Sequence, residues 1–112
     1  MQEIQKLLNA KPYMKNLGIK KYFDAINSIW KMDLLLTITE DEIYFDFPEE
    51  NDVTIRFENV GDLTISDMCW IAPHRVIIYD HAENQYESHQ RFQLEEQEDM
   101  LNFFFEKAEI LS

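Results

Sequence analysis

The stretch Val53-Thr54-Ile55-Arg56-Phe57-Glu58 alternates apolar and polar residues at every step. Successive side chains of a β-strand point to opposite faces, so this pattern is typical of a strand with one face buried and the other in solvent. Residues 59–62 follow as a predicted turn, because they contain Asn, Gly and Asp. The alternation resumes with Leu63 and Ile65. The sequence therefore predicts antiparallel strands joined by short turns.

Strand-like segments recur at near-regular spacing on both sides of this stretch. They share short length and either alternating or β-branched apolar residues, and they are residues 34–38, 43–47, 63–66, 68–71, 76–79 and 90–94. The intervening segments, residues 39–42, 48–52, 72–74 and 80–88, are polar or contain proline, as turns and loops do. Seven or eight short strands at such spacing favour an antiparallel sandwich or half-barrel.

The N-terminal part of the chain allows helices. Ile4, Leu7 and Leu8 recur at helical spacing, which predicts a helix over residues 2–10 that ends before Pro12. Residues 16–18 are a predicted turn. The apolar residues of 19–30 fit a second helix, whereas the alternation from Ala25 onward fits an extended path. Periodicity does not choose between these two alternatives.

The C-terminal residues 100–111 carry a second ambiguity. Met100, Phe104 and Ala108 fit a helix, whereas Leu101, Phe103 and Phe105 fit a strand. We favour a strand that pairs with residues 91–95 across the acidic segment 96–99, because phenylalanine is common in sheets. The predicted fold is one α+β domain, residues 1–112, of mainly antiparallel β sheet (sandwich or half-barrel) with an N-terminal helical segment.

Hydrophobic content, cysteine count and the lack of targeting or membrane segments indicate which class of protein this is. Hydrophobic residues make up 46% of the 112 residues, enough for a core despite the charge. A single cysteine, Cys69, excludes an intrachain disulfide and fits a reducing compartment. The N-terminus lacks the features of a signal peptide, and no apolar run is long enough to span a membrane. We expect a cytoplasmic protein.

Charge is distributed unevenly along the chain. Residues 32–112 carry twenty acids and four bases, a net charge of −16, whereas residues 1–31 carry six lysines and two acids, a net charge of +4. Repulsion among so many negative charges opposes folding. We therefore expect that the acidic part serves to bind a partner of opposite charge. The acidic part repels phosphates and anionic lipids, which argues against direct binding to nucleic acid or membranes.

Four acidic clusters fall at predicted turns, where they can merge into one negative face that attracts a basic protein. Each cluster alone is explained by solubility, but the four together favour a binding face. The candidate partner-binding residues are Glu40, Asp41, Glu42, Glu49, Glu50, Asp52, Glu83, Glu87, Glu95, Glu96, Glu98 and Asp99. Affinity would need aromatic anchors, for which the candidates are Tyr44, Trp70, Tyr79 and Tyr86, with core packing as the alternative for Trp70.

Other chemistry finds little support in the sequence. The spacing of His74, His81, His89 and Cys69 matches no common zinc pattern, and no oxyanion or orienting motif accompanies Cys69. We therefore expect no catalytic residue, no metal and no cofactor. Two alternatives stay open. One is a small-ligand-binding protein or enzyme with a pocket of histidine and carboxylate. The other is an oligomerising module in which residues 1–31 dock onto the acidic part of a second copy.

Three stretches resemble a known group of proteins: Tyr22-Phe-Asp-Ala-Ile26, residues 53–67 (VTIRFENVGDLTISD) and residues 100–111 (MLNFFFEKAEIL). They are similar to small acidic β-rich proteins found beside bacterial polymorphic toxins, the immunity-protein-like families. The resemblance implies a cytoplasmic inhibitor that caps a toxin domain, often a basic nuclease. It implies no catalytic residues.

Overall fold

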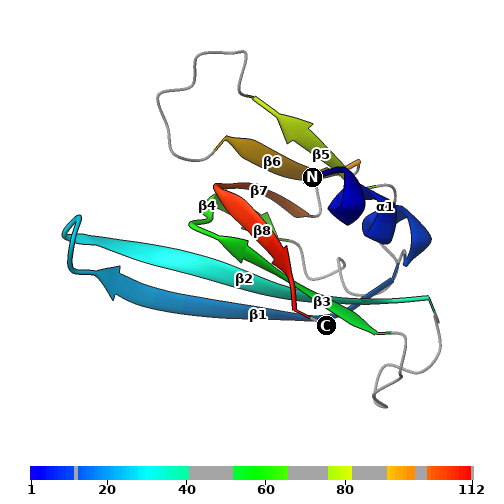
Figure 1. Ribbon diagram of the computed structural model, residues 1–112, viewed down its shortest axis with the longest axis horizontal. Coiled ribbons are helices and arrows are strands. Elements are labelled where there is room, and N and C mark those ends of the chain that lie inside the picture. The colour runs from blue at the N-terminus through cyan, green and yellow to red at the C-terminus, as the bar shows by residue number, and fades with distance from the viewer. Residues whose placement is uncertain (12, 41–51, 66–75, 82–90, 98–100, 112) are drawn as a thin grey trace.

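The computed structural model describes residues 1–11, 13–40, 52–65, 76–81, 91–97 and 101–111. These residues form one helix and eight strands (Figure 1). In chain order the elements are α1 (Gln2–Ala10), β1 (Tyr13–Asp24), β2 (Ile29–Thr39), β3 (Val53–Glu58), β4 (Gly61–Ile65), β5 (Val76–Asp80), β6 (Phe92–Glu96), β7 (Leu101–Phe105) and β8 (Lys107–Ile110).

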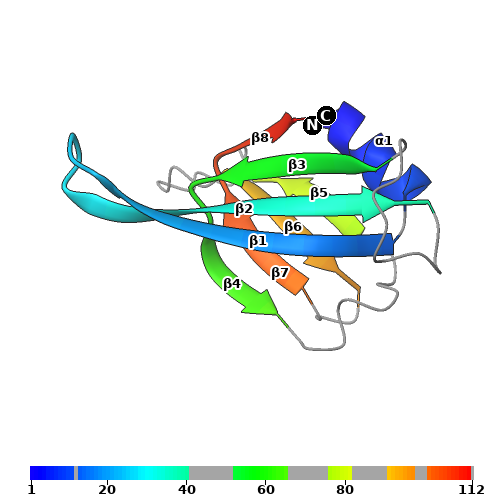
Figure 2. The ribbon, with the colours of Figure 1, turned by 90° about the horizontal axis from the view of Figure 1, so that it is seen from below.

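The strands pair into two antiparallel sheets within the described residues. One has the order β1-β2-β3-β8 and the other β4-β7-β6-β5. Figure 2 shows the two sheets face to face, with the strands of one crossing those of the other. The prediction of a mainly antiparallel fold with an N-terminal helix is confirmed. Among the described residues, no helix combines the length and apolar character needed to cross a membrane.

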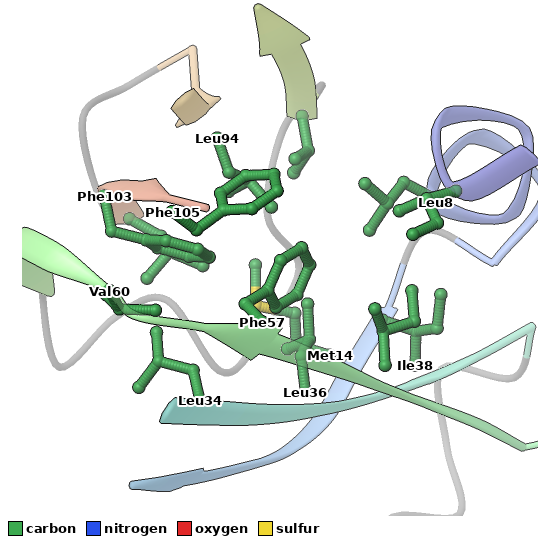
Figure 3. Packing of buried hydrophobic residues seen from close by; sticks show 14 residues of the cluster. Leu8, Met14, Leu34, Leu36, Ile38, Phe57, Val60, Leu94, Phe103 and Phe105 are labelled. Carbon is green, nitrogen blue, oxygen red and sulfur yellow. The ribbon is translucent and has the colours of Figure 1, made fainter. Parts of the chain in front are cut away.

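Aromatic side chains join the two sheets. The ring of Phe57 on β3 meets the rings of Phe103 and Phe105 on β7 edge-on, with centroid distances of 5.1 and 4.9 Å. Figure 3 shows these three rings with Leu34 and Leu36 of β2 on one side and Leu94 of β6 on the other. The alternation of residues 53–58 is therefore confirmed as predicted, because its apolar members Ile55 and Phe57 are the buried ones.

The helix over residues 2–10 is also confirmed. α1 buries Ile4 and Leu8 against the core, at the end of the sandwich opposite to the β1–β2 turn (Figure 1). Gln5 fixes it to the edge of the second sheet: its Nε2 donates to the carbonyl of Val76 (2.9 Å), and its Oε1 accepts from the amide of Ile78 (2.7 Å). One side chain thus continues the hydrogen bonding of β5 onto the helix.

The C-terminal strand prediction is confirmed over residues 101–105. β7 pairs with β6 so that Leu94 faces Phe103 and Phe92 faces Phe105. The sequence did not predict β8 as a separate strand. The chain bends at Glu106, whose amide donates to the carbonyl of Glu58 (3.0 Å), and it then joins the other sheet beside β3. A change of sheet leaves no signature in a pattern that records only burial.

One prediction for the N-terminal part is wrong, and one open alternative is decided. Residues 16–18 are no turn but the middle of β1, where Leu17 faces Leu36 and Gly18 faces Leu35. Of the two alternatives left open for residues 19–30, the helix is excluded, because β1 runs to Asp24 and a turn occupies residues 25–28. The extended alternative holds from Ile29 onward. In both cases pairing with the apolar strand β2 overrides the local preference.

Several boundaries also differ from the prediction. Asp80 ends β5 instead of beginning a loop, and Gly61 and Asp62 begin β4 instead of closing a turn. Glu96 belongs to β6, not to the predicted acidic segment 96–99 at the tip of its hairpin. The predicted strands 43–47 and 68–71 lie outside the described residues, as do most of the predicted loops around residues 48–51 and 82–88.

The position of Phe57 between the sheets makes a testable prediction. Phe57→Ala removes the ring that contacts both Phe103 and Phe105, and we expect it to lower the free energy of unfolding by about 3–5 kcal/mol. Phe23→Ala, at an exposed position of β1, is the matched control and should cost less than about 1 kcal/mol. Urea denaturation followed by circular dichroism measures both, and equal losses would contradict this account of the core.

Candidate partner-binding surface

Four of the twelve predicted partner-binding residues lie in the described part of the chain: Glu40, Asp52, Glu95 and Glu96. The carboxylate of Glu40 is exposed just after β2 and lies 3.3 Å from the ammonium group of Lys11. Glu95 lies on β6, partly exposed, opposite Asn102 of β7. These two carboxylates are accessible to a partner. The other eight residues, Asp41, Glu42, Glu49, Glu50, Glu83, Glu87, Glu98 and Asp99, lie outside the described residues.

Asp52 and Glu96 are placed differently from Glu40 and Glu95. The side chain of Asp52 is only 14% exposed and forms an ion pair with Lys15 (2.5 Å). Glu96 is 0% exposed, because it follows Glu95 on β6 and therefore points to the opposite face, into the molecule. Neither residue presents its carboxylate to solvent, so both contribute to the fold and not to an accessible acidic surface.

Ion pairs within the chain occupy several of the bases. Lys11 and Lys15, from the basic N-terminal part, pair with acidic residues of their own chain, Glu40 and Asp52. Arg91 binds both carboxylate oxygens of Asp80 (2.7 Å each). With acids in such excess over bases, pairing leaves most of the negative charge of residues 32–112 uncompensated.

A second surface lies on the β1–β2 hairpin. Figure 1 shows this hairpin projecting well beyond the rest of the molecule. β3 pairs with β2 only from Leu34 to Ile38, so the outer part of the hairpin is a two-stranded ribbon. We call residues 19–31 the hairpin tip. Its exposed large apolar side chains are Ile19, Phe23, Ile26, Ile29 and Trp30.

Asp24 holds the turn of the hairpin tip in a fixed shape. Its Oδ1 accepts from the amides of Ile26 (3.0 Å) and Asn27 (3.4 Å), and its Oδ2 accepts from Asn27 Nδ2 (2.8 Å) and the ammonium of Lys31 (3.0 Å). The hydrogen bonds from the side chains of Asn27 and Lys31 lower the pKa of Asp24 from 3.8 to about 2. Ser28 completes the turn in the left-handed region, with φ of 54°.

Asp33 fixes the base of the projecting ribbon. Its Oδ1 accepts from the hydroxyl of Tyr22 on β1 (3.1 Å) and from the amide of Asn59, between β3 and β4 (3.1 Å). Burial, followed by the nearby charge of Asp33, raises the pKa of Tyr22 above its usual 10.0. One buried carboxylate thus ties the hairpin to the neighbouring turn, so the tip projects in a defined direction.

Of the predicted histidines and aromatic anchors, the structure describes His81 and Tyr79. His81 lies next to β5, and its Nε2 is 2.8 Å from the side-chain oxygen of Gln93. Tyr79 is partly exposed, as an anchor would be. In the described part of the chain, no three His, Cys, Asp or Glu side chains are grouped closely enough to hold a metal ion. The candidates Tyr44, Cys69, Trp70, His74, Tyr86 and His89 lie outside the described residues.

The sequence reasoning missed Phe23 and Trp30 as surface residues. The spacing of the apolar residues in 19–30 suggests a helix or an extended path and does not identify these two as exposed, because apolar residues at regular spacing are usually buried. A signal was present: Asp24, Asn27 and Ser28 are turn-forming residues in the middle of the segment. A hairpin turn at that point places both aromatic residues near its tip.

Comparison with known proteins identifies the family. A family model described as "Immunity protein PIM8" matches residues 1–108, so the chain belongs to the PIM8 immunity protein family. This finding confirms the resemblance to immunity proteins. No curated protein and no solved structure matches the chain.

The pKa of Asp24 provides a test of the turn geometry. Its carboxylate should stay ionised well below pH 3.8, and its ordering effect should be lost only as the pH falls through about 2, because the folded-state pKa lies below the ordinary value. The ¹³C shift of the Asp24 carboxyl group, followed by NMR as the pH is lowered, measures this midpoint. In Asn27→Ala the midpoint should move up toward 3.8. A midpoint near 3.8 in the unaltered chain would contradict the geometry.

Proposed function

We propose that this member of the PIM8 immunity protein family is a non-enzymatic inhibitor that binds and neutralises a cognate toxin. The family match over residues 1–108 carries this proposal, since immunity proteins bind cognate toxins. The charge of the chain supports a finer statement about the target. A net charge of −16 over residues 32–112 favours a basic toxin domain, and a nuclease is the leading candidate, because nucleases attract phosphates with basic grooves.

The proposed mechanism is electrostatic capping. The acidic residues, among them the accessible Glu40 and Glu95, attract the basic surface from a distance and occupy the groove that would otherwise receive a phosphate backbone. Charged surfaces of opposite sign raise association rates by orders of magnitude, and salt screens the effect. Binding should therefore be fast at low ionic strength and slower at high ionic strength.

Co-expression tests the inhibitor proposal. The chain should protect cells from its cognate toxin when the two are co-expressed, and the two purified proteins should bind stoichiometrically. Raising the salt from about 50 mM to about 500 mM should lower the association rate at least tenfold. An absence of both protection and binding would refute the inhibitor proposal. Tight binding with a salt-independent association rate would refute the electrostatic mechanism alone.

The two accessible carboxylates, Glu40 and Glu95, allow a prediction for the association rate. Glu40→Gln together with Glu95→Gln should lower the association rate constant for the toxin a few-fold, with little change in dissociation, because exposed charges at the edge of an interface act mainly on association. The control is Glu3→Gln, which removes an exposed charge from α1, outside the acidic clusters. Stopped-flow or surface plasmon resonance measurements compare the rate constants. An equal effect of the control, scaled per charge, would mean that only net charge matters.

A further inference from the structure

The apolar inner face of the first sheet continues past the point where the second sheet covers it. Residues directly opposite each other in an antiparallel pair point to the same side, and alternate residues of a strand share a face. Ile19 faces Leu34 and Phe23 faces Trp30, so all four side chains lie on the inner face. Leu34 is 0% exposed, whereas Phe23 and Trp30 are 51% and 74% exposed. We call this row of apolar side chains on the inner face the apolar stripe. One end of the apolar stripe lies in the core, and the other end is exposed to solvent.

A groove of about 530 Å³ opens where the stripe leaves the core. Lys21, Trp30 and Met32 line it on the hairpin, and Val60 with the first residues of β4, Gly61 and Asp62, line it on the opposite side. The amide of Val60 donates to the carbonyl of Met32 (2.7 Å), which connects the two walls. The walls therefore keep their spacing without a ligand.

The two aromatic rings of the hairpin tip are held in place before any partner arrives. Phe23 and Trp30 lie with their centroids 5.5 Å apart in a tilted arrangement. Asp24 fixes the turn that joins their strands, through its contacts to Ile26, Asn27 and Lys31. Rigid aromatic residues lose little conformational entropy on binding, which is why such residues dominate the binding energy of interfaces.

The charge of the hairpin tip is opposite to that of the rest of the chain. Its charged residues are Lys20, Lys21 and Lys31 against Asp24. Lys31 is paired with Asp24, whereas Lys20 and Lys21 are exposed and form no ion pair with any described residue. A surface that fits the tip must therefore combine an apolar pocket with carboxylates at its border.

We propose that the hairpin tip is the anchor of the toxin complex, with Phe23 and Trp30 entering an apolar pocket of the toxin domain and Lys21, on the same face, meeting carboxylates at the border of that pocket, while Lys20 adds positive charge from the opposite face of the ribbon. This inference rests on the proposed function and adds a second contact of opposite sign to it. The acidic part attracts the basic groove and the basic tip matches an acidic border. Two contacts of opposite sign admit only one docking orientation, since the reversed one would place like charges together.

A second copy of this chain is the competing occupant, and the charges argue against it. Each copy carries a net charge of −12, so two copies repel each other at long range. A hairpin tip that covered the acidic part of another copy would also block the surface that the toxin needs. A basic toxin domain would not be repelled by the chain, and its binding to the hairpin tip would leave the acidic part available for the same toxin.

Trp30→Ala and Phe23→Ala in the full-length chain test the anchor against the purified toxin domain. Each should weaken binding at least about 30-fold, mostly through faster dissociation, as expected for an anchoring residue at the centre of an interface. The matched control is Ile110→Ala on β8, an exposed apolar residue outside the hairpin tip, which should leave the affinity within about 3-fold of the parent. Lys21→Glu, which keeps the apolar side chains, should weaken binding about 10-fold.

The outcomes separate this inference from the function on which it rests. If the unaltered chain does not bind the toxin, the proposed function fails. If it binds and the substitutions of Phe23, Trp30 and Lys21 leave the affinity unchanged, the function stands and the anchor is refuted. Sedimentation equilibrium covers the competing occupant: a dimer that Trp30→Ala converts to a monomer, with toxin affinity unchanged, would assign the hairpin tip to a second copy and overturn the inference.

Discussion

The packing of Phe57 against Phe103 and Phe105 is the contact on which the arrangement depends, because it joins the two sheets at their centre. The strands that meet there have unequal lengths. β1 and β2 have 12 and 11 residues, whereas each described strand of the opposite sheet has five. Short strands cannot cover long ones, so the outer half of the β1–β2 hairpin extends past the core with its apolar face uncovered. The exposed position of the hairpin tip follows from this mismatch in length.

The same structure separates two kinds of charge. Lys11 and Lys15 lie close to the acidic part of their own chain and pair with Glu40 and Asp52, whereas Lys20 and Lys21 are carried away from it on the hairpin. A basic segment that looks uniform in the sequence is therefore divided by the fold. Lys11 and Lys15 form ion pairs inside the molecule, whereas Lys20 and Lys21 are presented to solvent on the hairpin that carries the exposed aromatic side chains. Among the described residues, the accessible carboxylates of Glu40 and Glu95 and the basic, apolar hairpin tip thus belong to one folded unit.

The sequence predicted the parts of the fold in which local pattern and burial agree. Residues 53–58 and 101–105 alternate because one face of each strand enters the core, and residues 2–10 form a helix whose apolar side faces that core. It failed where a long-range contact decides, at residues 16–18 and at β8, which changes sheets after Glu106. The candidate site divides in the same way. Acidic residues are recognisable as a class, but strand parity decides that Glu96 is buried while Glu95 is accessible. The aromatic residues of the hairpin tip follow the same pattern as core residues, so only the relative lengths of the strands identify them as surface.

The most direct test of this account is hydrogen–deuterium exchange of the full chain, alone and saturated with its toxin domain. Amides are protected where a partner excludes water or stabilises local structure. We expect increased protection of residues 19–31, whose apolar side chains become buried, together with little change in β8 and in α1, which lies at the end of the molecule opposite the hairpin tip. Protection confined to α1 and β8, with residues 19–31 exchanging as fast in the complex as in the free chain, would contradict it.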